Sequence, residues 1–110
     1  MKIMEYMTKN EKFRDSGGWM IKELTPAVVC SDGFRMSVQA SEYAYCYPRE
    51  NTGPHYEFEV GFPSEKEELL MEWAETPEAP TETVYGYVPA DVIDEVIKKH
   101  GGFAKNSEES

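Results

Sequence analysis

The dipeptide Asp32-Gly33 between two apolar runs is the feature that most limits how this chain can fold. Residues 27–30 read AVVC and residues 34–38 read FRMSV. An Asp-Gly pair in this position favours a tight hairpin, because a type I′ turn needs φ > 0 at both central residues. The sequence therefore predicts a β-hairpin at 27–39, and an antiparallel sheet follows from it.

Period-two alternation predicts three more strands, over 43–47, 55–62 and 83–88. Ser64 and Glu67 have the spacing of a capping box, which predicts a helix over 64–75. A second, amphipathic helix is expected over 91–100, with Gly101-Gly102 as its stop signal. The expected fold class is α+β: a small antiparallel sheet with a hairpin, packed by two helices.

The length of 110 residues fits one domain. Residues 1–18 end in Ser-Gly-Gly and are predicted to form a flexible leader, 19–103 a single α+β domain, and 104–110 a disordered tail. No apolar run reaches the roughly 18 residues needed to span a bilayer, and the N-terminus lacks the apolar stretch of a secretory signal. We expect a soluble protein of the host cytoplasm that does not bind membranes.

The net charge of −10 is unevenly distributed along the chain. Residues 1–50 hold seven basic and seven acidic side chains, whereas residues 51–110 hold four basic and fourteen acidic ones. Within 57–82, nine glutamates face one lysine, Lys66. Such a field repels phosphate backbones and attracts basic protein surfaces. Direct nucleic-acid binding is therefore not expected.

Six of these glutamates form a candidate binding surface. Two lie on the predicted strand and four recur at helical spacing on the predicted helix: Glu57, Glu59, Glu65, Glu68, Glu72 and Glu75. Like charges at that spacing cost helix stability, which suggests that the surface serves more than solubility. The functional interpretation is that these carboxylates imitate duplex phosphates. The structural interpretation is an ordinary solvated acidic surface.

A tyrosine stripe forms a second candidate surface. Tyr43, Tyr45 and Tyr47 share one face of the predicted strand, and Ala44 and Cys46 share the other. Three interpretations stay open for the stripe. The rings pack on the sheet or on the segment around Trp19; they stack on nucleic-acid bases, which the charge disfavours; or they bind a protein.

The sequence offers little for catalysis. Cys30, Cys46, His55 and His100 lack the short paired spacings of compact zinc sites. No serine or cysteine lies in a nucleophile motif, and no glycine-rich loop precedes a helix. We therefore expect no enzyme activity, no metal and no cofactor. The cysteines are expected to be reduced packing residues, and His100 to be a cation at a helix C-terminus.

Several segments resemble a group of small proteins encoded by bacteriophages and prophages. They are 36–41 (MSVQAS), 45–49 (YCYPR), 59–64 (EVGFPS), 80–89 (PTETVYGYVP) and 99–102 (KHGG). The similarity covers about residues 22–103. It implies a phage genetic context rather than a mechanism. Small acidic phage proteins include inhibitors of host defence, among them anti-CRISPR proteins.

Two functions follow as expectations. The leading one is a non-enzymatic phage protein whose acidic, DNA-mimicking surface blocks a basic, nucleic-acid-handling host protein, such as a CRISPR effector. The alternative is a small protein-interaction or homo-oligomeric module, a homodimer for example, that binds through the tyrosine-rich face.

Overall fold

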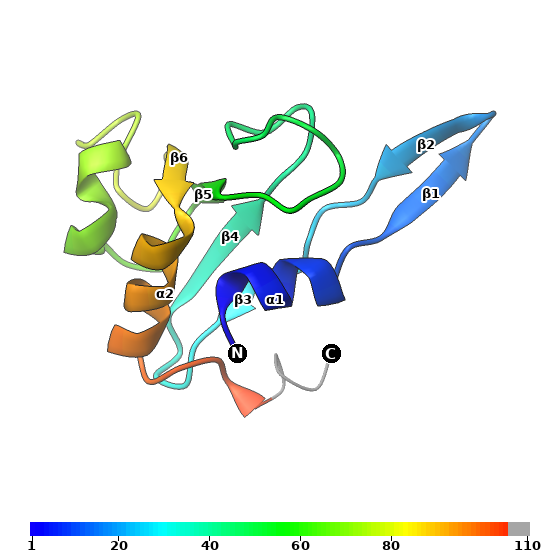
Figure 1. Ribbon diagram of the computed structural model, residues 1–110. Helices are drawn as coiled ribbons and strands as arrows, with labels where there is room; N and C mark the ends of the chain where they lie inside the picture. Colours follow the sequence, from blue (N-terminus) through cyan, green and yellow to red (C-terminus); the bar gives the residue numbers. More distant parts are fainter. Residues whose placement is uncertain (106–110) are drawn as a thin grey trace.

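The computed structural model describes residues 1–105 and shows an α+β fold with two antiparallel sheets (Figure 1). The predicted fold class is confirmed. The elements, in chain order, are α1 (Ile3–Lys9), β1 (Phe13–Ser16), β2 (Trp19–Lys22), β3 (Val28–Val29), β4 (Arg35–Gln39), β5 (Glu57–Gly61), the 3₁₀ helix η1 (Glu68–Trp73), β6 (Val84–Pro89) and α2 (Ala90–Lys99).

The core lies between the four-stranded sheet, ordered β3-β4-β5-β6, and the two α-helices, which lie next to each other (Figure 1). Alternation on the strands puts Val38, Phe58 and Val60 into the core, where each is almost fully buried. Ile93 and Val96 meet them from α2. The smaller sheet pairs β1 with β2 and forms an arm that projects from this body (Figure 1).

The hairpin at 27–39 is confirmed, but its turn differs from the expected type I′. The Cys30 N–H donates to the Phe34 carbonyl at 2.8 Å, and the Gly33 N–H donates to the Cys30 carbonyl at 2.9 Å. Only Gly33 in the loop has a positive φ, at 95°. This is the three-residue hairpin loop with glycine in the left-handed region. Asp32 stabilises the turn through its carboxylate, which accepts the Phe34 N–H at 2.9 Å, and not through a positive φ.

The N-terminal segment is not a leader outside the domain. Ile3, Tyr6 and Met7 of α1 are buried in the same core as the sheet. The Ile3 N–H donates to the Asp94 carboxylate of α2 at 2.7 Å. The sequence did not predict that this segment packs in the core, because its helix is only seven residues long and has no side-chain cap. Its tertiary contacts, rather than local sequence signals, hold it in place.

Two predicted elements are corrected by the structure. Residues 43–47 do not form a strand, apart from one isolated bridge between Tyr47 and Glu57. The α-helix over 64–75 is a 3₁₀ helix that begins only at Glu68, because the Ser64 hydroxyl accepts the Arg35 N–H instead of capping a helix. The cap is Glu67, whose side chain accepts the Leu69 N–H at 2.8 Å.

The C-terminal helix agrees with its prediction within one residue. Gly101 has a φ of 89° and donates to the Lys98 carbonyl, and Gly102 donates to the Ile97 carbonyl at 2.8 Å. These two bonds form a Schellman motif, so the glycine stop is confirmed. Of the predicted disordered tail, residues 106–110 lie outside the described part of the chain. The Ala104 N–H, just before them, donates to the Val29 carbonyl.

Candidate protein-binding site

The six predicted glutamates do not lie on one helix. Glu68 and Glu72 are on η1, while Glu65 precedes it and Glu75 follows it; all four are exposed. Glu57 and Glu59 are half-buried on β5, where they alternate with the core residues. Glu59 borders a small hollow of about 130 Å³ with Gln39 and Tyr43. The predicted belt is thus two groups, of which only the group around η1 is fully exposed.

We call the exposed group the acidic rim. It includes two further exposed glutamates in the segment between η1 and β6, and comprises Glu65, Glu68, Glu72, Glu75, Glu78 and Glu82. The only ion pair found within it joins Lys66 to Glu68 at 3.3 Å, and both side chains are more than half exposed. Such a pair contributes little stability. The rim therefore keeps most of its negative charge available to a partner.

The tyrosine stripe is exposed although its strand is absent. Tyr43, Tyr45 and Tyr47 have exposed fractions of 84%, 41% and 61%, whereas Ala44 and Cys46 are buried. The predicted two faces are therefore confirmed. The interpretation that the rings pack on the sheet or on the segment around Trp19 holds in part, because Tyr45 lies against Gly86 and Tyr87 of β6, whereas Tyr43 and Tyr47 are mostly exposed. The Arg49 guanidinium lies 5.4 Å from the centre of the Tyr45 ring, a cation–π contact.

The two predicted groups meet at one cavity, which we call the aromatic cavity. It has a volume of about 300 Å³ and is lined by Tyr45, Trp73, Glu75, Gly86 and Tyr87. The Tyr45 and Tyr87 ring centres are 6.1 Å apart, and the planes are tilted by 46°. A member of the tyrosine stripe and a member of the acidic rim thus share a site, although they are thirty residues apart in the sequence.

An irregularity in β6 positions this cavity. Tyr85 and Val88 are both fully buried, which regular alternation forbids for residues three apart. Phe58 pairs with Val88 and Val60 pairs with Tyr85, so β6 contains one residue more than β5 between these two pairs. This irregularity and the left-handed φ of 57° at Tyr87 let Tyr85 and Val88 both face the core and turn the Tyr87 ring outward. Gly86 lets Tyr45 approach, because a Cβ there would lie 3.2 Å from the Tyr45 Cβ. Non-glycine residues held in this conformation are often found at functional sites.

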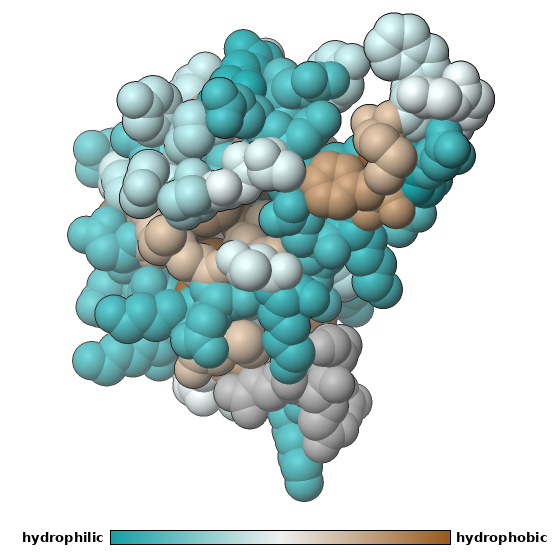
Figure 2. All heavy atoms as spheres, turned by 45° about the vertical axis from the view of Figure 1, so that its right-hand side comes forward, coloured by the Kyte–Doolittle hydropathy of each residue, from teal (hydrophilic) through white to brown (hydrophobic). Residues whose placement is uncertain are grey.

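The β1–β2 arm carries a second exposed apolar surface. Trp19, Met20 and Leu24 are 76%, 63% and 82% exposed. Figure 2 shows apolar side chains gathered on this arm, at the upper right of the view. A hollow of about 270 Å³ separates the arm from the loop that carries Tyr43. A two-stranded hairpin with both faces exposed is only marginally stable by itself.

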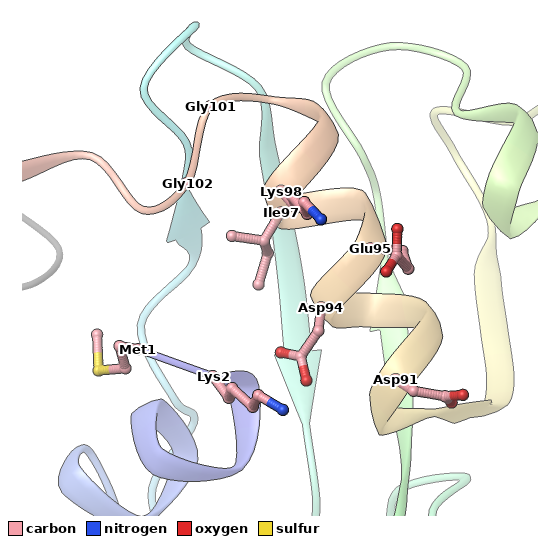
Figure 3. Close-up of a pocket in the computed structure, with 9 residues that line it drawn as sticks. All are labelled: Met1, Lys2, Asp91, Asp94, Glu95, Ile97, Lys98, Gly101 and Gly102. Carbon is pink, nitrogen blue, oxygen red and sulfur yellow. The ribbon is translucent and has the colours of Figure 1, made fainter.

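A cavity of about 680 Å³ lies between the start of α1 and α2 and is not organised as a site (Figure 3). Its walls include three carboxylates, from Asp91, Asp94 and Glu95. Asp94 points toward the Lys2 side of the cavity, while Asp91 and Glu95 point away from it. Because the three groups do not converge, they form no ligand set.

An ionic cluster lies at the C-terminal end of α2, with Glu67 and His100 buried at its centre and Asp32 and Lys99 about half exposed. His100 Nδ1 lies 2.6 Å from the Asp32 carboxylate, and Nε2 lies 2.8 Å from the Glu67 carboxylate. Lys99 Nζ also reaches Glu67, at 2.9 Å. The imidazole stacks on the Phe34 ring with centres 4.1 Å apart. Both ring nitrogens face carboxylate oxygens, an arrangement that favours the doubly protonated, cationic imidazole. The cluster ties the hairpin turn, η1 and α2 together.

The pKa values in this cluster follow from its hydrogen bonds. Burial alone would lower the pKa of His100, but the bonds to Asp32 and Glu67 outweigh it and raise that pKa above its usual 6.5. Burial alone would raise the pKa of Glu67; the bonds from Leu69, Lys99 and His100 hold it below 4.5. The Phe34 N–H and then His100 lower the pKa of Asp32.

These directions predict how stability depends on pH. Because the pKa of His100 is raised, protonated His100 stabilises the fold fully below pH 6.5, and this contribution is lost as the pH rises through the folded-state pKa. Because the pKa of Glu67 is lowered, its carboxylate stabilises the fold fully above pH 4.5, and this contribution is lost as the pH falls through the folded-state value. In urea titrations the free energy of unfolding should therefore fall as the pH rises from about 6.5 through the raised folded-state pKa of His100. His100→Gln should flatten this fall; an equally steep fall in that variant would contradict the assignment.

Within residues 1–105, no group of three or more His, Cys, Asp or Glu side chains is arranged so that it could hold a metal ion. Asp32, Glu67 and His100 do come together, but they bond to one another. Cys30 and Cys46 are unpaired and buried, as packing residues are expected to be, and burial and then Asp32 raise the pKa of Cys30 to about 11. His100 cannot act as a base while both its nitrogens serve carboxylates. Over the same residues, the helices are too short or too polar to span a membrane.

Sequence reasoning missed Trp73 and Tyr87 at the aromatic cavity and Glu67 in the ionic cluster. Trp73 is half-buried, packs against the core and also borders the cavity. A glycine between two tyrosines at 85–87 was the signal that another residue approaches the strand there. The capping-box spacing distinguished Glu67 as a local cap, but no local signal indicated its bonds to Lys99 and His100.

Comparison with known proteins identifies no relative. The sequence matches no protein-family model, and no curated protein and no solved structure is significantly similar to it. The site itself therefore carries the functional argument.

Proposed function

We propose that this is a non-enzymatic binding protein that attaches to a basic protein surface through the acidic rim and the adjoining aromatic cavity. The observation that carries the proposal is that Tyr45 and Glu75, from the two predicted surfaces, line the same cavity. Tyrosine and tryptophan supply much of the binding energy of protein interfaces. The surrounding carboxylates speed association with a basic partner.

The kind of partner follows from the charge. An exposed rim of six glutamates with one lysine repels nucleic acid and suits the channels in which proteins hold nucleic acid. With the resemblance to phage-encoded proteins, this supports a host nucleic-acid-handling protein as the target, for which a CRISPR effector is our first candidate. On this proposal the protein inhibits its target by occupying the place of the phosphates.

The proposal predicts that binding is strongly salt-dependent and sensitive to charge reversal. Affinity for a panel of purified CRISPR effectors should fall steeply from about 50 to about 300 mM NaCl, because screening shortens the reach of exposed charges. The double variant Glu68→Lys/Glu72→Lys should bind at least about tenfold more weakly, at the level found for close charge pairs at interfaces. Biolayer interferometry would measure both effects.

The matched control is Glu5→Lys/Glu23→Lys, which makes the same charge change at exposed positions outside the rim. It should retain most of the affinity. Equal weakening in the two double variants would mean that only net charge matters. Binding that is unaffected by salt and by both variants would contradict the electrostatic proposal.

A second candidate is self-association through the β1–β2 arm. It is favoured by the exposure of Trp19, Met20 and Leu24 beside Tyr43. The same measurements separate the two candidates, because an apolar interface on the arm would persist at about 300 mM NaCl and in the charge-reversed variant.

A further inference from the structure

We propose that the aromatic cavity binds a lysine side chain of the partner, with methylated lysine bound most tightly. The inference rests on the proposed function in one respect only, namely that the partner is a basic protein. It adds the chemistry that the cavity recognises. Three aromatic side chains and one carboxylate line the cavity: Tyr45, Tyr87, Trp73 and Glu75.

The first argument is the chemistry of the rings. The face of an aromatic ring attracts a cation, and tryptophan does so best. Tyr45 already attracts one within this molecule, since the Arg49 guanidinium lies over its ring at 5.4 Å. Arg49 is not among the residues that line the cavity, so the cavity itself stays open to a second cation.

The second argument is the unpaired carboxylate. Glu75 makes no side-chain hydrogen bond or ion pair within residues 1–105. Its backbone is fixed instead, because the Glu75 N–H donates to the Val84 carbonyl at 3.0 Å. A carboxylate held beside three aromatic residues complements an ammonium group and disfavours an apolar or anionic occupant.

The third argument separates lysine from arginine. A planar guanidinium binds between rings when they are nearly parallel, whereas the Tyr45 and Tyr87 planes are tilted by 46°. Tilted rings with centres 6.1 Å apart surround a compact, rounded group better than a flat one. Methylation keeps the charge of the ammonium and makes it easier to desolvate, so it should strengthen binding.

The test uses Trp73 as the reporter. The chain has two tryptophans, so Trp19→Phe leaves Trp73 as the only one. The probes are acetylated, amidated pentapeptides that differ at one central residue: lysine, trimethyl-lysine, arginine or norleucine. Fluorescence titration should show saturable binding in the order trimethyl-lysine, lysine, arginine, with no binding of norleucine.

Matched variants locate the site. Tyr87→Leu and Glu75→Gln should each weaken binding of the trimethyl-lysine peptide about fivefold to tenfold, as expected for one lost cationic contact. Tyr87→Phe should retain binding, because it keeps the ring. Tyr47→Leu and Glu78→Gln remove an exposed ring and an exposed carboxylate outside the cavity, and should have no effect.

Three results would overturn the inference: equal binding of the norleucine peptide, tighter binding of the arginine peptide, or equal effects of Tyr87→Leu and Tyr47→Leu. Tetramethylammonium that binds as tightly as the peptide would also overturn it, since the ligand would then be a free quaternary ammonium ion rather than a side chain of a partner protein. Failure of these titrations with a normal charge-reversal effect removes only the inference. A failed charge-reversal test with lysine bound in the cavity removes only the proposed function.

Discussion

The variant Glu67→Ala should unfold with a free energy lower by about 3 to 5 kcal/mol. The Glu67 side chain is 1% exposed and accepts hydrogen bonds from Leu69, Lys99 and His100. Its removal leaves the His100 cation without one of its two acceptors, and it takes away the cap of η1. Urea unfolding at about pH 6, followed by circular dichroism, would measure the loss while His100 is charged.

The neighbouring residue provides the control. Glu68 has a 74% exposed side chain and pairs only with Lys66, so Glu68→Ala should change stability by no more than about 0.5 kcal/mol. If Glu67→Ala does not fold, Glu67→Gln retains the shape and one acceptor oxygen and should show a smaller loss. Similar losses at positions 67 and 68 would refute the ionic cluster as a stabilising element.

Ile3→Ala should cost about 2 to 5 kcal/mol, the range for truncating a fully buried aliphatic side chain. Ile3 is 0% exposed in a core that it shares with the sheet and α2. The hydrogen bond from its backbone to Asp94 does not involve the side chain and should survive. The loss therefore reports on packing alone, measured as the shift of the urea midpoint.

Met4→Ala, at the next position, is the matched control because Met4 is 37% exposed. It should cost much less than Ile3→Ala. If residues 1–18 were instead a flexible leader, both substitutions would leave stability unchanged. Hydrogen exchange of the α1 amides gives an independent readout, since a docked helix protects them.

Patterns that depend on neighbouring residues predicted this fold well. The hairpin at 27–39, the strand ending near Gly61 and the helix ending at Gly101-Gly102 all rest on alternation, turn residues or a glycine cap. Even the 43–47 segment buries Ala44 and Cys46 as alternation predicts, although it lacks the backbone pairing of a strand. Side-chain direction was thus more predictable there than hydrogen bonding.

The errors arose where distant residues determine local structure. Ser64 fits a capping box, but its hydroxyl is used by Arg35, twenty-nine residues away. Glu67 fits the other half of that box, yet it is buried against Lys99 and His100. The aromatic cavity depends on the left-handed Tyr87, which resolves a conflict between two buried residues in β6. These contacts join residues far apart in the chain, so the spacing of neighbouring residues does not predict them.

The backbone bonds at the outer strands determine how a partner can attach. β6 is an edge strand, but the Glu75 N–H bonds to Val84, and the Tyr87 N–H bonds to the carbonyl of Tyr45. At the opposite edge, Ala104 bonds to Val29 on the short β3. Covered edges resist β-augmentation and the aggregation that follows from it. A partner of the main sheet must therefore recognise side chains rather than add a strand to either edge.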